Sequence, residues 1–120
     1  MAIDDYTFLK NGIEDNDLSD LFGSNIEVST YAIKIIKKYY SKVKTISPNH
    51  SIVYRGDFYS LLTKYGIPSF IHYLTCLING FKASSDLKDE MSEILVVDPT
   101  YLSNIETLLN NEKKEQIMTV

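Results

Sequence analysis

The chain has 120 residues, of which 44% are hydrophobic and 23% are charged. This length suits one domain with one core, and the composition is ordinary for a globular protein. No apolar run approaches the roughly 18 residues of a membrane span, the N-terminus lacks the apolar core of a secretory signal, and the single cysteine has no partner for an internal disulfide. We therefore expect a cytoplasmic protein that does not enter the membrane.

The formal net charge of −4 conceals an uneven distribution along the chain. Residues 1–30 carry seven acids and one lysine, residues 31–70 carry six lysines, one arginine and one acid, and residues 71–120 carry eight acids and four lysines. The central third is therefore basic between two acidic thirds. This pattern predicts a basic face on a protein that is acidic overall.

The first strong periodic signal follows a segment, residues 1–23, that we expect to be a flexible arm. From Ile26 to Ile46 the sequence IEVSTYAIKIIKKYYSKVKTI repeats apolar residues every three or four positions, which predicts one amphipathic helix. Many of these residues are β-branched, so a strand is the alternative, but the period and the length favour a helix. The predicted inward face consists of Val28, Ala32, Ile35, Ile36, Tyr39, Val43 and Ile46.

The most apolar segment is interrupted by a glycine and a proline. After a predicted loop over residues 47–56, Asp57 opens a helix that Gly66 closes in the left-handed conformation. Pro68 lies near the first turn of a second helix, which is apolar on nearly every side and ends at Asn79-Gly80. A helix of this kind normally lies at the centre of a bundle.

Two further helices are predicted towards the C-terminus. One covers SSDLKDEMSEILVV, residues 84–97, with Leu87, Met91, Ile94 and Leu95 inward, and the other starts at Asp98-Pro99 with Tyr101, Leu102, Ile105, Leu108 and Leu109 inward. Residues 111–120 are expected to fray. The sum is a single all-α domain over residues 1–120, a compact bundle of five to six helices.

Candidate catalytic and metal-binding residues are few. We interpret His72 as a structural histidine, His50 as a solvated loop residue, and Cys76, one helical turn after His72, as a small buried thiol rather than half of a Cys–His pair. The acids at Asp15, Asp17 and Asp20 and at Asp86, Asp89, Glu90 and Glu93 lack the spacing of a calcium loop and the apolar surroundings of a carboxylate hydrolase. We expect a protein that is not an enzyme and binds no metal or cofactor.

The basic residues are the better candidates for a site. Lys34, Lys38 and Lys42 are spaced four apart, which places them on one face of the predicted helix, and Lys37 flanks them. Such a row neutralises phosphates but carries no pattern for reading bases. Exposed tyrosines, among them Tyr40, Tyr54 and Tyr59, could stack on bases. The predicted nucleic-acid-binding residues are Lys34, Lys37, Lys38, Lys42, Lys44 and Arg55.

The segment SLLTKYGIPSFIHYL resembles the small, all-helical subunits of RNA-guided CRISPR effector complexes, especially the type III-B small subunit. The Tyr54-Arg55 pair resembles the segment that precedes the motif in that family. The motif itself consists of the paired aliphatics Leu61 and Leu62, then Gly66-Ile67, and then a second helix with Phe70, Tyr73 and Leu74. The resemblance implies a non-catalytic subunit of an antiviral complex. Copies would stack along the guide–target RNA duplex and contact its backbone beside other effector subunits.

The acidic thirds of the chain support a different interpretation. A small helical protein with an acidic surface could occupy the basic site of a protein partner, as an inhibitor or adaptor from a virus or mobile element would. The two interpretations differ in partner: a guide RNA with effector subunits in one, a single foreign protein in the other.

Overall fold

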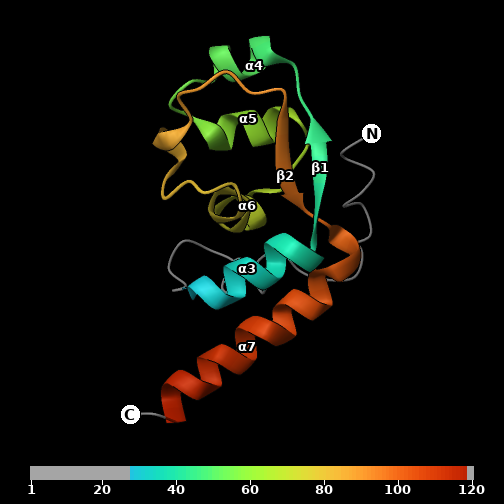
Figure 1. Cartoon of the computed structure of the whole chain (residues 1–120), viewed down its shortest axis with the longest axis vertical. Helices are drawn as coiled ribbons and strands as arrows, with labels where there is room; N and C mark the ends of the chain where they lie inside the picture. The colour runs from blue at the N-terminus through green and yellow to red at the C-terminus, as the bar shows by residue number, and fades with distance from the viewer. Residues whose placement is uncertain (1–27, 119–120) are drawn as a thin grey trace.

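The computed structural model describes residues 28–118, with side chains described through Glu112. The predicted arm over residues 1–23 and the acidic cluster at Asp15 to Asp20 lie outside the described residues. The described elements are α3 (Thr30–Tyr39), β1 (Ser41–Thr45), α4 (Pro48–Val53), α5 (Phe58–Lys64), the 3-10 turn η2 (Ser69–Ile71), α6 (His72–Ile78), η3 (Ser84–Asp86), β2 (Glu93–Val97), η4 (Pro99–Tyr101) and α7 (Leu102–Met118) (Figure 1).

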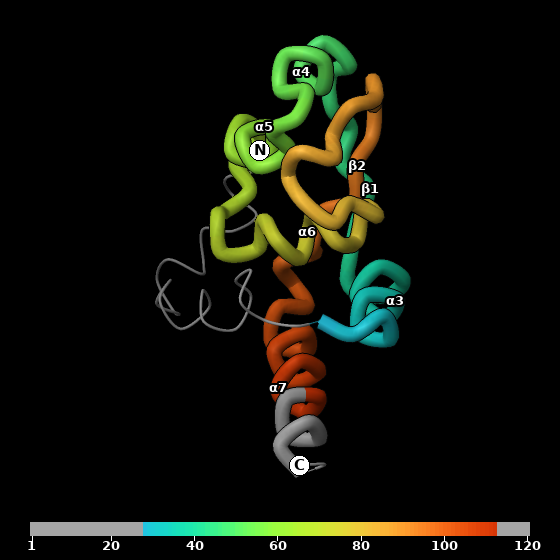
Figure 2. The backbone as a smooth tube through the Cα atoms, turned by 90° about the vertical axis from the view of Figure 1, so that its left-hand side faces the viewer, coloured from blue at the N-terminus to red at the C-terminus, as the bar shows by residue number. Residues whose placement is uncertain are grey.

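The domain is mostly helical, as predicted, but it is not purely α-helical, because β1 and β2 form a two-stranded antiparallel sheet. Helix α6 lies in the middle and contacts α3, α5 and β2. In Figure 1, α3 lies below α6, α5 and α4 lie above it, and the sheet runs along one side. Figure 2 shows α7 running beside α3, which it contacts. No helix within residues 28–118 is long and apolar enough to cross a bilayer.

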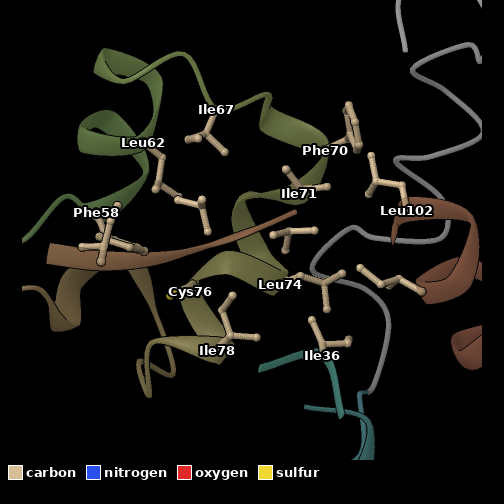
Figure 3. Close-up of a cluster of buried hydrophobic side chains, with 14 of the residues drawn as sticks. Ile36, Phe58, Leu62, Ile67, Phe70, Ile71, Leu74, Cys76, Ile78 and Leu102 are labelled. Carbon is tan, nitrogen blue, oxygen red and sulfur yellow. The ribbon is translucent and has the colours of Figure 1, made fainter. Parts of the chain in front are cut away.

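The hydrophobic core is built around α6 and confirms the prediction that this helix is central. Leu74, Cys76 and Ile78 are buried on α6, and they meet residues of α3, α5 and η2 (Figure 3). The largest side chains that are fully buried are Ile36, Phe58, Leu61, Leu62, Ile71, Leu74, Ile78, Leu87, Val96 and Ile105.

The helix predicted from Ile26 to Ile46 is wrong in its second half. The α3 helix ends at Tyr39, and residues 41–45 form strand β1. The Ser41 hydroxyl donates to the Lys37 carbonyl at 2.5 Å and so competes with a further helical turn. Beyond it, Ser-Lys-Val-Lys-Thr alternates polar and apolar residues with a period of two, and the EILVV strand offers a partner.

This change redistributes the predicted inward face of that helix. Ala32, Ile36 and Ile46 are buried as expected, but the side chains of Tyr39 and Val43 are 56% and 60% exposed. Val43 lies on the strand, where the helical period no longer decides which side it faces.

The helix predicted over residues 84–97 is also wrong. Only the 3-10 turn Ser84–Asp86 is helical there, because the Asp86 carboxylate accepts hydrogen bonds from the main chain of Lys82 and Ala83 and closes a local turn. The four consecutive aliphatic residues of EILVV then form β2, as a short buried strand does. Leu87 and Ile94 are buried nonetheless.

The segment predicted as a loop contains a short helix, α4. Pro48 occupies its first turn, where the missing N–H costs nothing. The Ser51 hydroxyl, which is buried, donates to the Pro48 carbonyl at 2.7 Å and accepts from the Met91 N–H at 2.9 Å. This link to the segment before β2 holds a helix that is too short to be stable alone.

The glycine–proline interruption behaves as the sequence predicts. Asp57 caps α5 by accepting from the Ser60 N–H, and Gly66 follows its end with φ of 80°. The Ile67 N–H donates to the Leu62 carbonyl and the Gly66 N–H to the Thr63 carbonyl, which is the Schellman arrangement. Gly80 ends α6 in the same conformation, with φ of 83°.

The helical segment begins where Asp98-Pro99 predicts, with the 3-10 turn η4 leading into α7, and the Asp98 carboxylate accepts from the Thr100 N–H. Leu102, Ile105 and Leu109 are buried as predicted. Tyr101 is 38% exposed rather than inward, with its ring centroid 5.2 Å from that of Tyr40. The helix continues to Met118, into the segment 111–120 for which the sequence predicts fraying.

Candidate nucleic-acid interface

The lysines of α3 form the basic part of the candidate interface. The Ser29 hydroxyl starts this helix by accepting from the Ala32 N–H at 3.0 Å and donates to the Glu112 carboxylate on α7, which fixes α3 to the body. Lys34, Lys37 and Lys38 are all exposed. Positions three and four apart lie on one side of a helix, so the three ammonium groups project from one arc opposite the buried Ala32–Ile36 face.

Two exposed tyrosines flank these lysines. Tyr31, at 64% exposure, lies three residues before Lys34 and therefore on the same side of α3. Tyr39 is exposed as well, and the Lys38 ammonium lies 5.3 Å from the centre of its ring. The predicted stacking tyrosines, Tyr40, Tyr54 and Tyr59, are instead half-buried against the core.

The sequence could have indicated Tyr31, because its spacing from Lys34 and Lys38 is helical. Tyr39 could not be found in this way, because the longer predicted helix assigned it to the inward face.

The two lysines on β1 do not share the α3 face, so the prediction of one lysine row through Lys42 is wrong. Lys42 pairs with Val96 and Lys44 with Ile94 across the sheet, and both lysines are half-buried. Paired residues share a face, so the lysine stems lie on the same face of the sheet as Val96 and Ile94.

Arg55 is separated from the α3 lysines by the length of the sheet. It is exposed just after α4, which lies at the opposite end of β1 from α3 (Figure 1). The structure therefore brings together Lys34, Lys37 and Lys38, places Lys42 and Lys44 next along the chain, and leaves Arg55 remote. Within residues 28–112, no ion pair involves Lys34, Lys37, Lys38, Lys44 or Arg55.

A shallow groove adjoins the C-terminal end of α3. Its volume is about 330 Å³, and its walls come from Tyr40 and one side of α7: Ser103, Asn104, Thr107, Leu108 and Asn111. The side chains offer hydroxyl and amide groups but no charge. Its lining contains no acid or base that would activate the Ser103 or Thr107 hydroxyl as a nucleophile.

His72 and Cys76 do not form a catalytic pair. The His72 imidazole Nε2 lies 2.7 Å from the Ile67 carbonyl, whereas the Cys76 thiol faces the Phe81 carbonyl at 3.7 Å. Burial lowers the pKa of His72, and burial, with the Asp86 carboxylate adding to it, raises the pKa of Cys76 to about 11. Cys76 is therefore a protonated core thiol at neutral pH, in line with the prediction for it.

His50 differs from its predicted role as a solvated loop residue. It lies in α4 and is half-buried, with Nδ1 2.6 Å from the Tyr65 hydroxyl, which also accepts from the Ser47 N–H at 2.8 Å. These contacts join the start of α4 to the end of α5. Among the described residues, no three His, Cys, Asp or Glu side chains are grouped so that they could hold a metal ion.

The residues that carry the resemblance to CRISPR small subunits lie mostly in the core. Leu61, Leu62, Ile67, Phe70 and Leu74 are buried, and Tyr73 is half-buried. They define how α5 and α6 pack, not what the surface binds. Comparison with protein-family models, curated proteins and solved structures finds no match to the chain.

Proposed function

We propose that this protein binds the phosphate backbone of nucleic acid through α3 and has no catalytic role. The observation that supports the proposal is the group of exposed lysines, Lys34, Lys37 and Lys38, on one side of a helix that is fixed to the core on its other side. A charged row on a rigid element keeps its spacing, so it can follow a regular series of phosphates. Lysines act as point charges and do not read bases, so the binding is independent of sequence.

The exposed aromatic rings favour RNA with unpaired bases among the possible nucleic acids. Tyr31 and Tyr39 stand beside the lysines, where a base can stack while the adjacent phosphate meets an ammonium group. Among RNA-binding proteins, the resemblance of residues 60–74 to CRISPR small subunits favours a structural subunit of an RNA-guided antiviral complex. Its partners would then be the guide and target RNA and the other effector subunits.

The charge distribution supports stacking of such subunits. The carboxylates of Asp86, Asp89, Glu90 and Glu93 are exposed, and the segment that carries them passes beside α4, at the other end of the molecule from α3 (Figure 1). These carboxylates outnumber the exposed cations nearby, Lys88 and Arg55, so they favour contact with the α3 lysines of a neighbouring subunit.

Filter binding to single-stranded RNA tests the proposal. The double variant K34E/K38E should weaken binding about tenfold or more at 50 mM salt and lower the slope of log K against log salt by about 1.4, because each lost phosphate contact on a single strand removes about 0.7. K82E/K88E is the matched control. It makes the same change in net charge at two exposed lysines outside α3, and it should bind nearly as the wild type does.

The measurement is made on the protein alone and on any complex that co-purifies with it, since an isolated subunit binds weakly. Equal losses of RNA affinity in the two double variants would show that the loss comes from net charge and not from the position of the lysines on α3. Unchanged binding by K34E/K38E in the assembled complex would remove α3 from the RNA site.

The exposed carboxylates also favour a second candidate function. A protein inhibitor or adaptor of viral or mobile-element origin would use Asp86, Asp89, Glu90 and Glu93 to occupy a basic site on its target. Affinity purification with mass spectrometry separates the two candidates. Effector subunits with a guide RNA support the first, and one foreign protein in stoichiometric amount supports the second.

A further inference from the structure

The groove of about 330 Å³ lies where the basic helix α3 meets α7. The two helices are in contact, and Figure 2 shows them side by side. The Ser29 hydroxyl at the start of α3 donates to Glu112 far along α7, whereas Tyr40 at the end of α3 packs on Tyr101 at the start of α7. The helices therefore run antiparallel, and the groove opens at the end of their seam that contains Tyr40.

The α7 wall of the groove is polar and uncharged. Ser103, Thr107 and Asn111 recur every four residues, so they share one exposed side of the helix with Asn104. The Thr107 hydroxyl donates to the Ser103 carbonyl at 3.0 Å and keeps its lone pairs as acceptors. Within residues 28–112, no hydrogen bond involves the side-chain amide of Asn104 or Asn111, so each amide offers two donors and one acceptor to a ligand.

The opposite wall is aromatic. The Tyr40 ring is half-buried and is held by Tyr101, with ring centroids 5.2 Å apart and planes inclined by 34°. Leu108, also half-buried, adds apolar surface to the lining. Nucleobase sites combine these features, because the base stacks on an aromatic ring while amides bond to its edge.

The groove is next to one of the α3 lysines. The Tyr40 N–H still donates to the Ile36 carbonyl at 2.9 Å, so the helical spacing of α3 extends to this residue. Lys37 is exposed three positions before Tyr40 and therefore lies on the same side of α3. A strand whose phosphates follow the α3 lysines passes the mouth of the groove.

We propose that the groove holds one unpaired base of an RNA strand, with the base ring against Tyr40 and its edge bonded to Asn104 and Asn111. The inference rests on the proposed function, which places the strand on α3. The volume is near the lower end of the roughly 300–1,000 Å³ that is usual for small-molecule sites, so the groove suits one nucleoside. The Ser103 and Thr107 hydroxyls can accept from the ribose 2′-hydroxyl, which DNA lacks.

The same chemistry explains why the groove requires a base without selecting one. The edge of every RNA base carries both a donor and an acceptor, and so does an asparagine amide, which rotates to match them. No charged residue is among the described residues of the lining, so a phosphate is favoured on α3 and a neutral base in the groove.

Fluorescence anisotropy on the full chain, alone and in any complex that co-purifies, tests the inference with two ligands. One is a single-stranded RNA, and the other is the same strand with abasic riboses. The N104A/N111A variant should bind the first about fivefold or more weakly than the wild type does and the second equally well, because the lost hydrogen bonds go to a base. N49A/N110A is the matched control: it replaces two exposed asparagines outside the groove and should bind both strands as the wild type does.

The outcomes separate this inference from the phosphate proposal. Wild-type affinity of N104A/N111A for both strands, with a loss in K34E/K38E, would overturn the groove site and leave the phosphate site standing. Equal losses of N104A/N111A on both strands would place the two amides on the backbone and would overturn the base site as well.

A nuclear magnetic resonance titration decides on the groove even if the chain binds no RNA, a result by which the phosphate proposal alone would fail. Uridine or adenosine monophosphate at millimolar concentration should shift the side-chain amide signals of Asn104 and Asn111 and leave that of Asn110 in place. Ribose phosphate, which lacks the base, should move none of them. Equal shifts with ribose phosphate, or no shift with either nucleotide, would overturn the inference.

Discussion

Replacing Asn79 with alanine should destabilise the protein strongly, although Asn79 is a half-buried polar residue at a helix end. Its amide makes three hydrogen bonds. It donates to the Thr75 carbonyl within α6 at 2.7 Å, and it joins α6 to β2 by donating to the Leu95 carbonyl at 2.8 Å and accepting from the Leu95 N–H at 2.9 Å. The variant leaves both outward main-chain groups of Leu95 without a partner beside the core. Each net hydrogen bond contributes about 1 kcal/mol, and each partly buried unpaired group costs about 1 kcal/mol more.

The expected loss for Asn79→Ala is therefore about 2–4 kcal/mol in the free energy of unfolding. Urea denaturation followed by circular dichroism measures it as a shift of the midpoint at constant slope. Asn110→Ala is the matched control, because Asn110 is exposed on α7, and such surface changes stay within about 0.5 kcal/mol.

A second substitution separates hydrogen bonding from side-chain volume. Asn79→Asp keeps the shape and the acceptor for Leu95, but it places a carboxylate against two carbonyl oxygens, so it should destabilise at least as much as alanine does. A loss below about 1 kcal/mol for Asn79→Ala, or wild-type stability for Asn79→Asp, would refute the assignment of this side chain as the closure of the sheet edge.

Three further predictions follow from single residues. Gly80→Ala should lower the free energy of unfolding by about 1 kcal/mol, measured by urea denaturation, because φ of 83° strains a residue that has a Cβ. No atom lies within 4 Å of the added Cβ, so the cost comes from the backbone conformation alone. Gly80→Asn should cost less, and equal stability of all three forms would contradict this backbone strain. Cys76, with its pKa raised to about 11, should react with a thiol reagent at pH 8 only as fast as the protein opens, and rapid labelling of the native state would contradict its burial. Burial lowers the pKa of His72 below its usual 6.5, so the unfolded state binds the proton more readily and the free energy of unfolding should fall as the pH drops below 6.5. His72→Gln should make stability depend less steeply on pH in this range, and an unchanged dependence would show that His72 is not its source.

The sequence predicted those parts of the fold that are set by local chemistry. Asp57, Gly66, Gly80 and Asp98 mark helix ends through caps and left-handed turns, which need only their immediate neighbours. The central position of α6 followed from its apolar residues on all sides.

The sheet could not be predicted in the same way, because it depends on two segments that are far apart in the chain. Lys-Val-Lys in β1 continues the helical spacing of α3 closely enough to hide its own period of two, and EILVV is apolar enough for a helix or a strand. Each strand is stabilised by the other and by Asn79, and none of these partners is visible within a local window.

The candidate site inherited this error. Lys34 and Lys38 were placed correctly relative to each other because both belong to α3, whereas Lys42 and Lys44 moved to the sheet when the helix ended at Tyr39. Where the helix ends thus determines which lysines can act together.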